Sequence, residues 1–313
     1  MPFPALPQPA SGDVLLVCTC YEDGTALWGE LLDEVGGHRE DDVLALPDSG
    51  VRLRLVEGSG WDSLHGGNVP ALVADADGSA PVAVLADPSL VYGGEGPLLV
   101  DLVVAPGRGV RIPSDRLGEV LAGLLETTLT FDDLIRDMDI YGTYQGDGGR
   151  PAFPTPTAPP RRSYPALPSP DAALLVRTSF DDEDGWRALL DELGGVDENG
   201  WVGADLDPDG IDMDHYPLTA LVVDDRAYNG LHPAEVPALV PPEEETTLVV
   251  LVDAGTYAGP GRPLTVVDLY DVPGQCAVLP CGDVGSMAAN LQIGNMDFAE
   301  FIEGEDGEEW LEE

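Results

Sequence analysis

The sequence predicts an α/β protein that consists of two tandem related domains, each a small mixed β-sheet covered by helices. The first observation is a duplication, because residues 14–37 and 173–195 both read as a short apolar strand, an acidic turn and an amphipathic helix that ends in two glycines. The second is a similar proline-rich lead before each copy, at residues 3–7 and 164–168. The third is the order of elements, since strands separated by helices imply parallel crossovers and glycine-rich hairpins imply antiparallel pairs.

The duplication sets the expected domain boundaries. The chain is predicted to contain a degenerate first repeat, a proline- and glycine-rich linker, a second repeat and an acidic tail, at residues 1–145, 146–163, 164–302 and 303–313. Each repeat is expected to run in the order strand, helix, strand, optional helix, three strands and two helices.

The helix of the opening stretch shows the clearest periodicity. In the second copy four apolar residues occupy one helical face at the spacing i, i+3, i+4 and i+7: Trp186, Leu189, Leu190 and Leu193. Aspartates before this helix can cap its first turn, where the helix dipole favours negative charge. We interpret Trp186 and its counterpart Trp28 as core residues rather than as residues that stack on a ligand.

The second strand is harder to place, because the repeats diverge after the first helix. In the second repeat we expect it at residues 218–225, followed by a short helix at Pro233–Leu239. In the first repeat the corresponding strand is predicted at residues 71–75. Only residues 76–80 then remain before the next strand, so the first repeat is expected to lack the short helix.

The repeats align again in their last parts. Three pairs of strands correspond: residues 81–87 with 247–253, 97–101 with 263–268, and 111–113 with 278–280. Two final helices are expected in each repeat, at residues 115–125 and 131–138, and at residues 283–291 and 297–302. Phe131 and Phe298 fix the register of the last helices.

The charge of the chain excludes several kinds of chemistry. The 313 residues include 58 acids and 14 bases, giving a formal net charge of −44, and every base is arginine. Without lysine there can be no Schiff base and no phosphate-binding loop of the Walker type. So much negative charge also disfavours direct binding to nucleic acid and favours a basic protein as partner.

The four cysteines are Cys18, Cys20, Cys276 and Cys281, and their spacings do not suit a zinc site. We therefore expect free thiols in a reducing compartment. The first residues lack the basic start and apolar core of a signal peptide, and no apolar run is long enough to span a membrane. A cytoplasmic location without membrane contact is the resulting expectation.

The second repeat resembles an uncharacterised family of bacterial domains, found mainly in high-GC Gram-positive bacteria. Four stretches carry the resemblance: residues 174–180 with Trp186, 222–225 with Tyr228, 264–269 and 290–301. The last, NLQIGNMDFAEF, is the most specific, since family members look like NNLxxANMDFxEF there. The first repeat departs from this pattern and has Gly123, Thr128 and Thr130 in place of Asn290, Asn295 and Asp297. The resemblance implies a fold but no activity.

Three groups of residues are candidate sites. Thr178, Asp224, Asp225 and Asp253 follow strands that we expect to be parallel, so they should gather at the carboxyl edge of the sheet, where open α/β sheets bind ligands. Such acids could bind magnesium or act as general acid and base. They could equally serve strand ends and loop caps. The first repeat has Thr19, Asp75 and Asp87 at the supposed equivalent positions.

Asn290, Asn295 and Asp297 form the second group. They are either a ligand site or helix caps, with Asp297 facing Glu300 as in a capping box.

The third group is Asp205, Asp207 and Asp209, which resemble the start of a calcium-binding loop with Gly210 at its sixth position. The twelfth position, however, is Tyr216 rather than a bidentate glutamate. Calcium at this loop and magnesium at the strand ends are therefore possible ligands only, and no cofactor is expected.

No motif of a hydrolase, a metalloprotease or a nucleotide-binding protein occurs in the chain. The favoured hypothesis is a non-enzymatic acidic interaction protein that neutralises a basic partner, as an immunity protein or antitoxin does. The acidic tail would extend the electric field that attracts this partner. The alternative is a protein that binds a small ligand or metal, or an enzyme, and that uses the strand-end aspartates.

Overall fold

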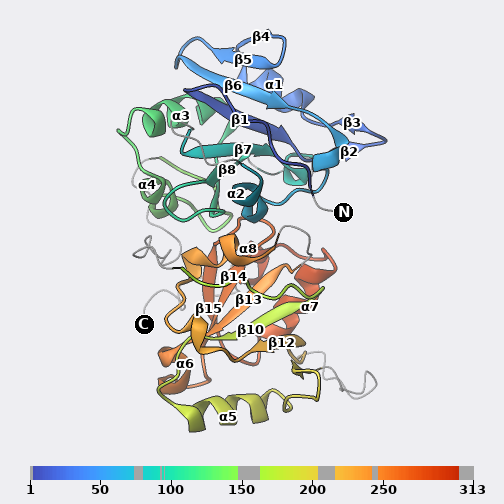
Figure 1. Cartoon of the computed structure of the whole chain (residues 1–313), viewed down its shortest axis with the longest axis vertical. Coiled ribbons are helices and arrows are strands. Elements are labelled where there is room, and N and C mark those ends of the chain that lie inside the picture. Colours follow the sequence, from blue (N-terminus) through green and yellow to red (C-terminus); the bar gives the residue numbers. More distant parts are fainter. Residues whose placement is uncertain are drawn as a thin grey trace. The chain divides into compact units, whose positions relative to one another are not determined.

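The structure is a computed structural model, and it describes residues 3–73, 80–91, 94, 96–146, 163–203, 216–241 and 246–302. The chain divides into unit 1, Met1–Pro159, and unit 2, Pro160–Glu313. Each unit is organised around one mixed sheet with helices, so the predicted fold class is confirmed (Figure 1). None of the described helices has the length and hydrophobicity needed to cross a bilayer.

The sheet of unit 1 is centred on β1 (Asp13–Cys18), whose six residues are all buried. Two strands flank β1 in parallel, β6 (Val51–Val56) and β7 (Val82–Ala86). The outer strands are antiparallel and complete the order β4-β5-β6-β1-β7-β8-β9: β4 (His38–Glu40), β5 (Val43–Leu46), β8 (Leu98–Asp101) and β9 (Gly109–Arg111). A small hairpin of β2 (Tyr21–Glu22) and β3 (Thr25–Ala26) follows β1.

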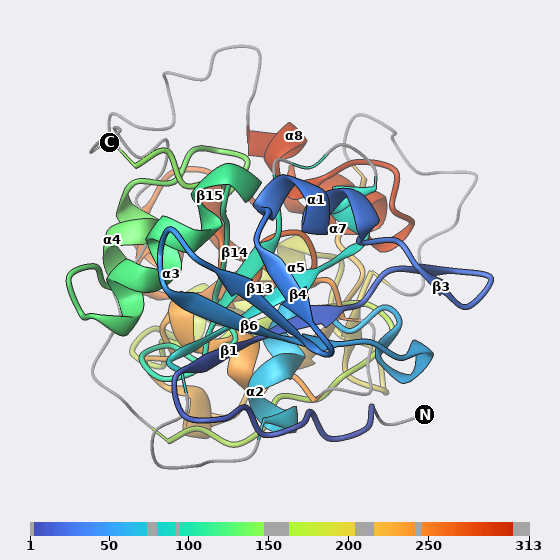
Figure 2. The ribbon, with the colours of Figure 1, turned by 90° about the horizontal axis from the view of Figure 1, so that it is seen from above.

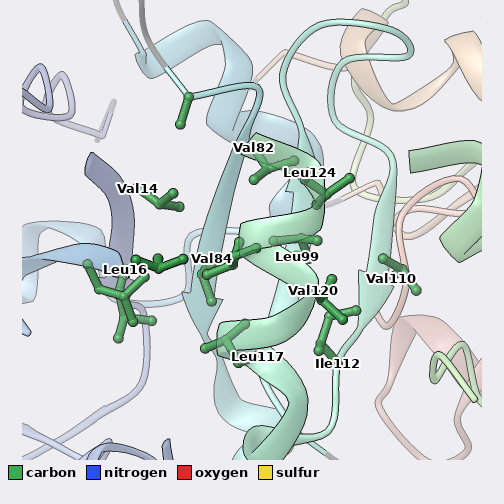
Figure 3. Packing of buried hydrophobic residues seen from close by; sticks show 14 of the residues in the cluster. Val14, Leu16, Val82, Val84, Leu99, Val110, Ile112, Leu117, Val120 and Leu124 are labelled. Carbon is green, nitrogen blue, oxygen red and sulfur yellow. The ribbon is translucent and has the colours of Figure 1, made fainter. Parts of the chain in front are cut away.

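Helices cover both faces of this sheet, which explains why β1 is apolar from Val14 to Cys18. One face of the sheet packs against α1 (Gly29–Val35), α3 (Leu117–Leu125) and α4 (Phe131–Arg136). Alternate residues of β1 point the other way, towards α2 (Val69–Leu72) and the proline-rich lead (Figure 2). Leu117, Val120 and Leu124 of α3 lie against strand residues that include Val84 and Leu99 (Figure 3).

Unit 2 repeats this plan with the sheet order β11-β12-β10-β13-β14-β15. The central β10 (Ala173–Arg177) is parallel to β12 (Ala220–Val223) and β13 (Leu248–Val252). The antiparallel strands are β11 (Trp201–Val202), β14 (Leu264–Asp268) and β15 (Cys276–Leu279). The helices are α5 (Glu183–Glu192), α6 (Ala254–Ala258), α7 (Val284–Gln292) and α8 (Phe298–Ile302), with 3-10 turns at 226–228, 233–235 and 237–239.

The predicted second strand of unit 1 is wrong. That strand is β6, whose sequence VRLRLV alternates apolar and basic residues, and not residues 71–75. Residues 69–72 instead form α2, so unit 1 has the short helix that it was expected to lack. Asp75 lies outside the described residues. The acid that follows the second strand of unit 1 is therefore Glu57, in the position of Asp224 in unit 2.

One buried aspartate in each unit holds the loop that follows β8 in unit 1 and β14 in unit 2. The sequence analysis did not identify either aspartate as a residue that fixes a loop. Asp101 accepts hydrogen bonds from the backbone N–H groups of Val103, Val104 and Ala105, at 2.9, 3.0 and 2.8 Å. Asp268 accepts from Tyr270 and Val272, at 2.8 and 2.5 Å. A carboxylate with several N–H donors tolerates burial, so the loop conformation is fixed from inside the protein.

Candidate functional site

The carboxyl ends of β10, β12 and β13 meet at one edge of the sheet in unit 2, as the sequence predicts. Thr178 is buried there, and both its backbone N–H and its hydroxyl donate to the carbonyl of Val252, at 2.9 and 3.1 Å. This side chain joins β10 to β13. Its polar atoms are thus already engaged inside the sheet.

Asp224 pairs with the buried Arg177. The Arg177 side chain is only 2% exposed, and its guanidinium donates to Asp224 at 3.2 Å and to Glu183 at 2.9 Å. It lies over the rings of Phe180 and Trp186, 4.5 and 5.2 Å from their centres. The indole Nε1 of Trp186 donates to the second oxygen of Asp224 at 3.0 Å. Hydrogen bonding from Arg177 also lowers the pKa of Glu183.

Asp225 and Asp253 are capping residues. Asp225 accepts from the backbone N–H of Ala227 at 2.8 Å. Asp253 accepts from Gly255 and Thr256 at 2.7 and 3.2 Å, and its own N–H donates to the Thr256 hydroxyl. Within the described ranges, no three His, Cys, Asp or Glu side chains are grouped so that they could hold a metal ion. The calcium-loop residues Asp205, Asp207 and Asp209 lie outside these ranges.

The asparagine-rich ending of unit 2 also consists of local hydrogen bonds. Asn295 donates from its side chain to Asn290 Oδ1 at 2.8 Å and from its backbone to the Asn290 carbonyl at 3.0 Å. The N–H of Asp297 donates to Glu300 at 2.8 Å, which is one half of the expected capping box.

In unit 1 the turns at the equivalent positions are formed by other residues. Thr128 bonds to the Gly123 carbonyl through its backbone and its hydroxyl, as Asn295 bonds to Asn290. Thr130 and Asp133 form a complete capping box at the start of α4. The Thr130 hydrogen bonds, together with Arg136, lower the pKa of Asp133.

The carboxyl edge of the unit 1 sheet has a different set of charges. Cys18 takes the place of Arg177, and Thr19 bonds to the Ala86 carbonyl as Thr178 does to Val252. Asp87 is bound by Arg111, with guanidinium nitrogens 3.1 and 2.8 Å from its two oxygens. Unit 1 thus places the arginine of its buried pair on β9 and the aspartate directly after β7, whereas unit 2 places its arginine on the central strand.

A groove of about 1010 Å³ opens beside this edge, between α1, the turn after β7 and the 3-10 turn Ser114–Arg116. Its lining includes the apolar side chains Ala26, Leu27, Leu31, Leu90, Val91 and Pro113. Three acids line it as well: Glu30, Glu34 and Asp115. Glu30 and Glu34 are one helical turn apart on α1 and so lie on one face.

None of the described residues that line the groove is basic, and no ion pair joins its three acids to any other described residue. A second hollow of about 730 Å³ shares Asp115 and adds Asp48, Glu119 and Glu126. Arg116 is the one base among its described lining residues, and its guanidinium lies 4.9 Å from the Tyr144 ring centre and donates to the Gln145 carbonyl at 2.7 Å. The groove is therefore lined by apolar side chains that are mostly half-buried or buried and by three acids that are exposed.

Comparison with protein families decides the identity of the fold. The model of a domain of unknown function, DUF6924, matches residues 13–147 and again residues 172–312. The chain belongs to the DUF6924 family. It contains two copies, so the predicted tandem of an uncharacterised domain is confirmed. A search of curated proteins found no match.

The acidic groove of the first DUF6924 copy was not among the predicted sites. Its signal in the sequence is modest: the helix GELLDEV carries two glutamates at i and i+4 beside the buried Leu31. The third acid, Asp115, comes from a segment more than 80 residues away, so only the tertiary structure brings it to the same groove.

The four cysteines are buried free thiols. Burial raises the pKa of Cys276 to about 12 and that of Cys281 to about 11, and it also raises the pKa of Cys18 and Cys20. Because the thiolate is the reactive form, none of these side chains is poised as a nucleophile at neutral pH.

We therefore expect iodoacetamide at pH 7.5 to label the folded protein very slowly and to label all four cysteines after unfolding in urea. Mass spectrometry would count the labels. Rapid labelling of Cys18 or Cys20 in the folded protein would contradict this assignment and would favour an enzyme.

Proposed function

We propose that this DUF6924 tandem is a non-enzymatic interaction protein that binds and neutralises a basic protein partner, in the manner of an immunity protein or antitoxin. The observation that carries the proposal is the groove of unit 1, where Glu30, Glu34 and Asp115 lie among apolar lining residues and no described lining residue is basic. A segment that combines apolar side chains with arginine or lysine would complement this surface in both shape and charge.

The net charge of −44 supports the same class of partner, because it repels phosphate backbones and attracts cations at long range. We also place the protein in the cytoplasm, and the four unpaired cysteines support a reducing compartment. The alternative, in which the strand-end aspartates bind a ligand or catalyse a reaction, would require Asp225 and Asp253 to release the N–H groups that they cap.

A binding measurement with a defined probe tests the proposal. The probe is an amphipathic peptide of alternating leucine and arginine, and its leucine–glutamate counterpart serves as the negative probe. The triple variant Glu30→Gln, Glu34→Gln and Asp115→Asn should bind the basic peptide about tenfold more weakly, since each exposed pair contributes about 0.5 kcal/mol. Association should slow as salt rises, because screening acts beyond about 8 Å at physiological ionic strength.

The control variant removes the same charge elsewhere on unit 1. Asp23→Asn, Asp41→Asn and Asp62→Asn replace exposed acids that do not line either hollow. This variant should keep most of the affinity. Equal losses in both variants would show that only total charge matters, and binding of the acidic peptide or of duplex DNA at physiological salt would overturn the proposal.

A further inference from the structure

In unit 2 the loop between α6 and β14 is held against the end of α5. Arg262 of this loop pairs with Glu192, with 3.1 Å between its Nε and the Oε2 of the glutamate. The carbonyl of the preceding Gly261 accepts from the N–H of Cys281, just after β15, at 3.2 Å. The dipeptide Gly261–Arg262 therefore connects α5 to the turn after β15 through one carbonyl and one guanidinium.

Unit 1 has the same two attachment points but no such dipeptide between them. Glu34 corresponds to Glu192, since each lies six residues after the buried tryptophan of its repeat. Ser114 corresponds to Cys281, since each directly follows the proline that comes after the last strand of its sheet. The loop that leads into β8, residues 88–97, contains no basic residue that could replace the arginine.

Both attachment points line the groove of unit 1. Among the described residues, none accepts from the N–H of Ser114 and none forms an ion pair with Glu34. The loop before β8 is held elsewhere, because the Arg111 guanidinium donates to the Gly96 carbonyl at 3.3 Å. Unit 2 has Val278 at the position of Arg111, two residues before the same proline, and a valine side chain cannot hold its loop in this way.

We propose that the basic partner places an arginine and the residue before it in the groove of unit 1, in the position that Gly261–Arg262 holds in unit 2. The partner's arginine pairs with Glu34, and the carbonyl before it accepts from the N–H of Ser114. Arginine fits better than lysine because Arg262 contacts its glutamate through Nε, a donor that an ammonium group lacks. This inference rests on the proposed function and specifies which chemical group the groove receives.

Binding of a short peptide to the full chain, followed by NMR, tests the inference. The probe has the sequence of residues 257–264, YAGPGRPL, with both ends blocked. We expect the amide proton of Ser114 to shift downfield as the peptide binds, since its N–H gains an acceptor. Glu34→Gln should weaken binding at least about tenfold. Glu30→Gln removes the same charge from the same helix, at the position of Ala188 in unit 2, and should weaken binding no more than about threefold.

A second peptide, with lysine in place of the arginine, tests the chemistry of the contact and should bind about tenfold more weakly. Equal affinity of the two peptides, equal losses in Glu34→Gln and Glu30→Gln, or no binding at about 1 mM peptide would overturn this inference. The leucine–arginine peptide separates it from the proposed function. Binding of that peptide alone would leave the proposed function standing, whereas failure of both probes would remove both.

Discussion

Replacement of Trp186 by alanine should lower the free energy of unfolding of unit 2 by about 3–5 kcal/mol, as expected for truncation of a large core side chain. Trp186 is 2% exposed and is among the largest fully buried side chains of the chain's described part. The change would also remove the ring on which the Arg177 guanidinium lies and the N–H that donates to Asp224. Arg177 would then keep its charge in a less well-packed site, which adds to the loss.

Urea unfolding followed by circular dichroism would measure this effect, with two variants for comparison. Trp186→Phe keeps an aromatic ring but loses the indole N–H, so it should cost clearly less than the alanine variant. Trp28→Ala should instead destabilise unit 1, because Trp28 is the equivalent buried residue beside α1. A loss below about 1 kcal/mol for Trp186→Ala would mean that the indole does not support the core.

Replacement of Arg111 by valine, the residue at the equivalent position of unit 2, should destabilise unit 1 by about 3–5 kcal/mol. The Arg111 guanidinium binds both oxygens of Asp87 and donates to Ser89 at 2.9 Å and to the Gly96 carbonyl at 3.3 Å. Both partners are largely buried, with side chains 6% and 11% exposed. Without the arginine, Asp87 would remain as a buried carboxylate that lacks its counter-charge.

A double-mutant cycle separates this effect from simple loss of packing. Asp87→Ala in the Arg111→Val background should recover part of the stability, because the double variant leaves no buried charge. Urea unfolding gives the free energy of unfolding of the wild type, the two single variants and the double variant. Strictly additive losses would show that the two side chains do not stabilise one another, and this would refute the assignment.

The sequence alone determined the features of this protein that depend on residues close together in the chain. The strand and helix of the opening stretch follow from periodicity and capping chemistry within about twenty residues, and the tandem follows from the recurrence of that stretch. The equivalence of Gly123 with Asn290 and of Thr128 with Asn295 comes from the family resemblance of the last part of the repeat. Asp225 and Asp253 cap the turns that follow them, which is one of the two roles that the sequence allowed, because a cap and the N–H groups it accepts are neighbours in the chain.

Only the tertiary structure decided which distant segments meet. β6 was missed because VRLRLV alternates apolar and basic residues, and its place beside β1 depends on a register between residues about 40 positions apart. α2 has four residues, too few to show a helical period. Arg177 reaches Asp224, Arg111 reaches Asp87, and Glu30 and Asp115 share a groove only after the sheet has formed. Strand pairing fixes these contacts through backbone hydrogen bonds, whose partners a residue pattern does not specify.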